Sequence, residues 1–239
     1  RSAASTVKEL AEKGANLSRA GRVEQTFEQD GLKGKDLVST ILSLCDETRD
    51  SQEPTIWLVI APAGQGKTVF FSSLFDQLYR RFQNEKAQNR LYPRPMPMLP
   101  EHIREAAGQN VGGLLDAFLR TEVGVAASRE LLEWMIETRH AMWMLDVLDE
   151  VIVRDDGFLN YLDYRIGARG SNPAILICVR DSLLSTSDSL IDFVNHNESV
   201  VTTFKLMPWD KQAVRSCAGF KFKNQKSATG GGEAALVRD

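Results

Sequence analysis

The stretch Ile56–Phe71, IWLVIAPAGQGKTVFF, holds an apolar run, a loop of small residues and the start of a second apolar pattern. Residues 61–68 of this stretch fit the pattern small-x-x-x-x-Gly-Lys-Thr, with Ala61 where the strict form has glycine. Glycines permit backbone conformations closed to other residues, so successive N–H groups of such a loop can turn towards an anion. A strand before the loop and a helix after it are the order that a phosphate-binding loop requires.

We therefore expect this loop to bind the phosphates of a nucleotide. The helix that begins near Gly66 aims the positive end of its dipole at the same phosphates. Lys67 would bridge the terminal phosphates, and the Thr68 hydroxyl would ligate Mg²⁺. The alternative, a glycine-rich turn with a surface lysine, does not explain the flanking strand and helix. The predicted nucleotide-binding residues are Ala61, Pro62, Ala63, Gly64, Gln65, Gly66, Lys67, Thr68 and Val69.

A second apolar run, HAMWMLDVLDEV at residues 140–151, ends in acidic residues. Asp146 follows the apolar residues directly, so its carboxylate is expected at the carboxyl end of a buried strand, the edge where α/β sheets bind ligands. There it would hold Mg²⁺, directly or through water. Asp149 and Glu150 add two carboxylates, one of which would orient or deprotonate the attacking water. The alternative is that this pair caps the next helix or faces solvent, but its spacing from Asp146 favours the catalytic interpretation.

The order of the elements predicts the fold class. Strands are expected at the two apolar runs described above and in two later segments, residues 172–182 and 199–210. Amphipathic helices are expected between them. Such alternation predicts an α/β fold, here a P-loop NTPase three-layer αβα sandwich with a mostly parallel central sheet. Residues 1–50 are predicted to be helical and to form an N-terminal extension. Prolines 93, 95, 97 and 100 indicate an extended edge segment or a loop, because proline cannot donate to a central sheet ladder.

The chain is predicted to be a piece of a longer protein. It has 239 residues, begins with Arg1 and ends in a glycine-rich stretch. We expect an N-terminal helical segment or linker at 1–50 and an NTPase domain at 51–220. Residues 221–239 are expected to be a flexible tail or the truncated start of another domain.

The composition is that of a soluble globular protein, with 43% hydrophobic residues and a net charge of −3. Such a charge recruits neither nucleic acid nor an anionic membrane, and no apolar run reaches the roughly 18–20 residues that span a bilayer. Cys45, Cys178 and Cys217 are odd in number and far apart, which predicts free thiols in a reducing, cytoplasmic compartment.

Two further groups of residues are predicted to have structural roles. The tryptophans at 57, 134 and 143 lie in apolar patterns and are expected in the core. A basic cluster has little aromatic interleaving and is interpreted as a solvated helix end rather than a nucleic-acid site. Its members are Arg80, Arg81, Lys86, Arg90 and Arg94.

The sequence LDVLDE at residues 145–150 resembles the acidic strand end of NACHT-type NTPases, within the STAND class of signalling ATPases. That family has an apolar strand, then Asp, a small residue, an apolar residue and Asp-Glu. Val147 departs from the pattern, since the family usually has Gly, Ala or Ser there. The proline-containing segment 95–106 is also similar to a strand of the family. The resemblance covers roughly residues 37–220.

The resemblance extends to AILICVRDS at residues 174–182 and to FKLMPWDKQAV at residues 204–214. The first segment is similar to a family strand whose final arginine, here Arg180, senses the terminal phosphate. The alternative is that Arg180 pairs with a surface carboxylate such as that of Asp181. The second is similar to the strand and turn that close the domain.

The resemblance implies an ATP-binding and slowly hydrolysing switch domain of a multidomain signalling protein, with innate immunity and antiviral defence as common settings. Such a domain lies between effector and sensor modules of the same protein, and exchange or hydrolysis often leads several copies to oligomerise. The bound species would be ATP or ADP with Mg²⁺, because no Asn-Lys-x-Asp element that would read guanine is present.

Three other functions remain open. An AAA-type motor or loader acting on nucleic acid or protein is the nearest rival, although its Asp-Glu normally adjoins the strand. A small-molecule kinase would need an arginine-rich lid, for which only Arg165 and Arg169 are at hand. A scaffold with a structural nucleotide would not need an intact set of phosphate, Mg²⁺ and water-activating residues, here Lys67, Thr68, Asp146 and Glu150.

Overall fold

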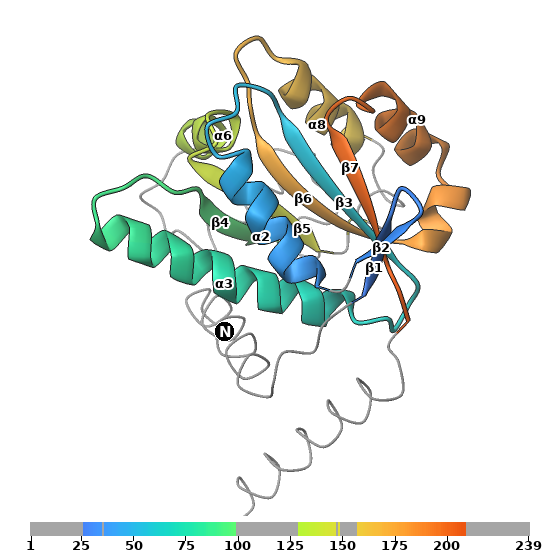
Figure 1. The fold of residues 1–239 in the computed structure, drawn as a ribbon. Coiled ribbons are helices and arrows are strands. Elements are labelled where there is room, and N and C mark those ends of the chain that lie inside the picture. The colour runs from blue at the N-terminus through green and yellow to red at the C-terminus, as the bar shows by residue number, and fades with distance from the viewer. Residues whose placement is uncertain (1–25, 35, 99–128, 147, 149–156, 209–239) are drawn as a thin grey trace, which may run out of the picture.

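The computed structural model describes residues 26–34, 36–98, 129–146, 148 and 157–208 (Figure 1). Its strands are β1 (Phe27–Gln29), β2 (Leu32–Gly34), β3 (Thr55–Ala61), β4 (Arg94–Met98), β5 (Ala141–Asp146), β6 (Ala174–Arg180) and β7 (Val201–Leu206). Its helices are α2 (Leu37–Glu47), α3 (Lys67–Ala87), α6 (Arg129–Glu137), α8 (Gly157–Gly167) and α9 (Asp188–His196), with a 3₁₀ helix, η2, at Asp181–Ser185.

The strands form one seven-stranded sheet in the order β2-β1-β7-β3-β6-β5-β4. Strands β7, β3, β6, β5 and β4 are parallel, and β1 pairs antiparallel with both β7 and β2. Every residue of β5, and all but one terminal residue each of β3 and β6, is buried, because successive side chains point to opposite faces and both faces are covered. This confirms the predicted α/β fold with a mostly parallel sheet.

Two hydrophobic cores lie on the two faces of the sheet. Helices α2 and α3 pack on one face, with alternate residues such as Trp57, Met144 and Cys178 between them and the sheet. Helices α6, α8 and α9 pack on the other face, over Trp143 and its neighbours. Figure 1 shows the two helical layers on either side of the sheet. Cys45 and Cys178 are buried and belong to no disulfide, as predicted, and Cys217 lies outside the described residues.

The helical prediction for residues 1–50 is wrong at 27–34, where β1 and β2 form a hairpin. Its turn is Asp30-Gly31, with φ angles of 50° and 78°. Asp-Gly between two short segments favours this two-residue turn because both positions need a positive φ. The ring of Phe27 packs edge-on against Phe204 of β7, with the centroids 5.6 Å apart. The helical prediction is confirmed at α2, whose N-terminus Asp36 caps; residues 1–25 lie outside the described part.

Strand β4 confirms the edge position that its prolines predict. The backbone N–H of Arg94 donates to the carbonyl of His140 at 2.9 Å, so alternate residues of β4 turn their N–H groups towards β5. Pro95 and Pro97 therefore occupy the positions whose nitrogens face the open edge, where no donor is needed. Missing donors at this edge also discourage pairing with another strand.

Trp134 corrects the prediction that three tryptophans lie in the core. Trp57 and Trp143 are buried, but Trp134 is 48% exposed. Its ring stacks on the His140 ring, with the centroids 4.7 Å apart. Helix α6 buries only Leu132 and Ile136, so its apolar face is narrower than its sequence indicates.

The amino ends of the central strands meet at the buried side chain of Arg139. Its guanidinium donates to the carbonyls of Asn172 at 2.9 Å, Glu53 at 3.0 Å and Thr48, and to the Thr55 hydroxyl at 2.7 Å. Burial lowers the pKa of Arg139 from its usual value, and among the described residues no carboxylate pairs with it. One cation therefore joins the end of α2 to the starts of β3 and β6.

We expect Arg139→Leu to lower the free energy of unfolding by about 3 kcal/mol, because several buried carbonyls lose their donor at once. Arg139 has a φ of 59°, and leucine keeps the same backbone strain, so the change isolates the guanidinium. Urea denaturation measures the loss. Arg169→Leu, at an exposed arginine, is the control. Equal stability of the two variants would contradict the role given to Arg139.

Candidate functional site

The glycine-rich loop joins the end of β3 at Ala61 to the start of α3 at Lys67. Gly64 and Gly66 have φ angles of 77° and 85°, in the left-handed region that favours glycine. The first helical hydrogen bond runs from the Phe70 N–H to the Gly66 carbonyl at 2.9 Å. The N-cap residue of α3 is Gly66, which has no side chain, and the positive end of the helix dipole points to the loop.

The Lys67 side chain folds back over this loop. Its Nζ donates to the carbonyl of Ala61 at 3.0 Å. In the parallel pairing of β3 with β6, Ala61 lies directly beside Arg180. The ammonium group is thus held at the carboxyl edge of the sheet, beside the end of β6.

Asp146 ends β5 at the same edge and is only 4% exposed. It pairs in register with Cys178 of β6. Met144 and Cys178 belong to the core beneath α2 and α3. Side chains alternate along a strand, so Asp146 and Arg180 lie on this same face of the sheet.

The strand order sets the lateral spacing of these groups. Because β6 lies between β3 and β5, Asp146 is two strands, or about 10 Å, from the glycine-rich loop. Arg180 is only one strand away. The sequence did not indicate this order.

The structure thus brings the loop, Lys67, Asp146 and Arg180 to one edge and one face of the sheet. Thr68 is exposed in the first turn of α3. Asp149 and Glu150 lie outside the described residues, and their roles stay predictions.

The donor set fits Mg²⁺ bound together with phosphate. A Thr68 hydroxyl and an Asp146 carboxylate are hard oxygen ligands, and Mg²⁺ commonly takes one or two protein ligands besides phosphate oxygens and waters. Within the described part of the chain, no group of three His, Cys, Asp or Glu side chains could form an all-protein metal cage.

A mostly parallel sheet with helices on both faces, and a glycine-rich loop between its central strand and the next helix, is the P-loop NTPase fold. None of the described helices has the length and apolar character needed to cross a membrane.

Comparison with solved structures finds matches at low sequence identity, and two forms of one protein have TM-scores above 0.5. The ORC2 protein of Aeropyrum pernix, solved as ADPNP-ADP complexes, is 14% identical with a TM-score of 0.53, covering 78% of this chain and 50% of its own. Its ADP form is 15% identical with a TM-score of 0.54, covering 80% and 51%. C. elegans PCH-2 is 16% identical with a TM-score of 0.45, covering 80% and 46%. The chain thus spans about half the length of these proteins. No protein-family model and no curated sequence matches it.

We expect Gly66→Ala to lower the free energy of unfolding by about 1–2 kcal/mol, because a Cβ at a φ of 85° is strained. Urea denaturation is the measurement. Gly167→Ala is the matched control: it lies at the end of α8, with a negative φ and no atom within 4 Å of the new methyl. The control is expected to be neutral or slightly stabilising. A neutral Gly66→Ala would mean that the loop does not hold this conformation.

Proposed function

We propose that this chain binds ATP with Mg²⁺, hydrolyses it slowly and acts as a nucleotide-dependent switch. The observation that supports this best is the convergence of Lys67, Asp146 and Arg180 on one face at the carboxyl edge of the sheet. Three charged groups at such an edge, together with a helix N-terminus, suit a bound triphosphate.

Each of the chain's own groups has a task in this proposal. Lys67 Nζ would exchange the Ala61 carbonyl for phosphate oxygens, which are stronger acceptors for an ammonium group. Thr68 and Asp146 would hold Mg²⁺, which neutralises phosphate charge when bound. Asp149 or Glu150 would activate the attacking water.

Arg180 would distinguish triphosphate from diphosphate. It ends β6 beside Ala61, and η2 begins at the next residue, Asp181, whose carboxylate accepts the Ser182 N–H at 2.8 Å. A contact between Arg180 and the terminal phosphate would therefore act on the segment that leads to α9. Such a ligand-dependent contact biases one arrangement over another.

The proposed setting is a larger cytoplasmic signalling or defence protein of the NACHT type. Its effector and sensor domains would flank this one, and the triphosphate state would favour self-association. The sequence LDVLDE and the arginine at the end of β6 support this finer assignment.

An AAA-type motor or loader is the second candidate, and the fold shared with the A. pernix ORC2 protein favours it. The two candidates differ in how they handle nucleotide. The purified protein is denatured and its extract is separated by ion-exchange chromatography. About one ADP or ATP per chain would support the switch, whereas an empty site with fast turnover of added ATP would favour the motor.

We expect Lys67→Ala to weaken ATP binding by at least about 100-fold, because charge-assisted hydrogen bonds to the phosphates are lost. The fold should persist, since the described structure gives this side chain only one hydrogen bond, to Ala61. Fluorescent-nucleotide titration measures affinity, and circular dichroism checks the fold. Lys86→Ala, at the exposed far end of α3, is the control. Unchanged affinity in the folded Lys67→Ala variant would overturn the assignment.

We expect Asp146→Asn to remove most of the gain in ATP affinity that Mg²⁺ provides, because the amide is a weaker ligand than a carboxylate. ATP affinity is measured with Mg²⁺ and with EDTA, and the ratio of the two is compared with wild type. Asp192→Asn, at an exposed aspartate on α9, should keep the wild-type ratio. A wild-type ratio in Asp146→Asn would show that Asp146 does not hold the ion.

A further inference from the structure

A cleft lies at the amino edge of the sheet, opposite the edge that holds the candidate nucleotide site. It is formed by the segments that precede β3, β4, β5 and β6. We call it the amino-edge cleft; its volume is about 690 Å³. Ligand pockets of small molecules commonly have about 300–1,000 Å³. The cleft is lined by Arg49, Asp50, Ser51, Gln52, Phe82, Arg90, Leu91, Tyr92, Pro93, Arg94, Met135, Thr138, Arg139, His140 and Asn172.

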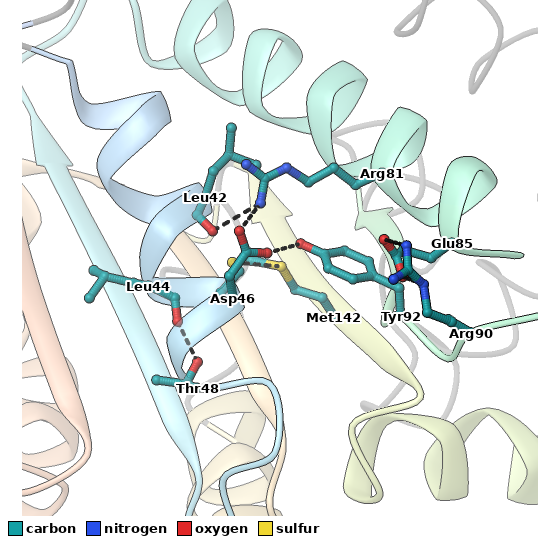
Figure 2. Close-up of polar contacts among 10 residues, drawn as sticks. Leu42, Leu44, Asp46, Thr48, Arg81, Glu85, Arg90, Tyr92 and Met142 are labelled. Atoms are coloured by element: carbon teal, nitrogen blue, oxygen red, sulfur yellow. Dashed lines mark hydrogen bonds and ion pairs between the residues drawn. The ribbon is translucent and has the colours of Figure 1, made fainter. Parts of the chain in front are cut away.

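Part of this lining is apolar and held in place. Phe82 comes from α3, Met135 from α6, and Leu91 with Tyr92 from the segment before β4. The Tyr92 hydroxyl donates to Asp46 at 3.3 Å, a contact that Figure 2 shows beside the Arg81 guanidinium. Burial raises the pKa of Tyr92, so the phenol stays uncharged and its ring forms part of the apolar lining. Leu91 is 75% exposed, which leaves an apolar side chain open to a ligand.

Four arginines line the cleft, and two of them form neither an ion pair nor a side-chain hydrogen bond with another described residue. Arg90 pairs with Glu85 at 2.7 Å, and Arg139 donates to backbone carbonyls. Arg49 and Arg94 make no ion pair or side-chain hydrogen bond with another described residue. Asp50 is the one acid among the residues that line the cleft. The cleft therefore has positive charge that its own lining does not balance.

We propose that the amino-edge cleft binds an organic anion with an apolar body, such as a medium-chain carboxylate. Apolar walls would take the body, and Arg49 and Arg94 would take the anionic group. Arginine presents a planar fork of donors that matches a carboxylate. A polyphosphate fits poorly, because it has no apolar body to place against Phe82, Leu91 and Met135. This site is separate from the nucleotide site and does not depend on the proposed function.

The full chain is titrated with 8-anilinonaphthalene-1-sulfonate, an aromatic anion whose fluorescence rises in apolar surroundings. We expect one saturable site from which octanoate displaces the probe and neutral octanamide does so at least about tenfold less well. Arg49→Gln and Arg94→Gln should each weaken octanoate displacement by about threefold to tenfold, the effect of losing one partly exposed charge-assisted contact. Arg169→Gln, an exposed arginine outside the cleft, should match wild type.

Two exposed leucines test the apolar wall separately. Leu91→Asp places a negative charge in the cleft and should weaken octanoate displacement by about tenfold or more. Leu32→Asp, at a 76% exposed leucine on β2, should not. Circular dichroism confirms that each variant is folded. Equal displacement by octanamide, unchanged displacement in both arginine variants, or equal loss in the two leucine variants would overturn the proposal.

Discussion

The covering of β3 and β6 on both faces is the constraint on which the rest of the structure depends. Apart from one terminal residue in each, their residues are buried, so helices must cover each face of the sheet. Polar chemistry is thereby confined to the two ends of the strands. At the carboxyl end, the chain leaves β3 through glycines and places a helix N-terminus at the same edge of the sheet as the buried Asp146. The location of the candidate nucleotide site thus follows from how the core is packed.

At the amino ends of the same strands, hydrogen-bond acceptors rather than donors need partners. There the backbone presents carbonyl oxygens, and helices α2 and α6 finish nearby with their negative ends. Arg139 satisfies several of these acceptors with one buried cation, in a left-handed backbone conformation that arginine rarely adopts. Strain at one residue is offset by hydrogen bonds to three separate segments. Contacts to the backbone consequently close the inner part of this edge, whereas Arg90 and Arg94 of the cleft are exposed.

Local patterns could be predicted from the sequence, whereas long-range partners could not. The glycine-rich loop and Asp146, the acid that ends β5, have signatures within a few residues, and both lie where their patterns indicate. The hairpin carried a local signal as well, in Asp30-Gly31, but its short strands are stabilised by β7, far along the chain. The strand order and the partners of Arg139 depend on contacts between segments distant in sequence. The exposure of Trp134 likewise depends on how α6 is rotated against the sheet.

Helix α3 connects the two edges of the molecule. It begins at Lys67 in the candidate nucleotide site and presents Phe82 to the amino-edge cleft, about 23 Å further along its axis. A small shift of α3 as a rigid body would change both sites together. Ligands at the two edges would then influence each other only to the extent that each prefers one position of this helix, and the influence would be reciprocal.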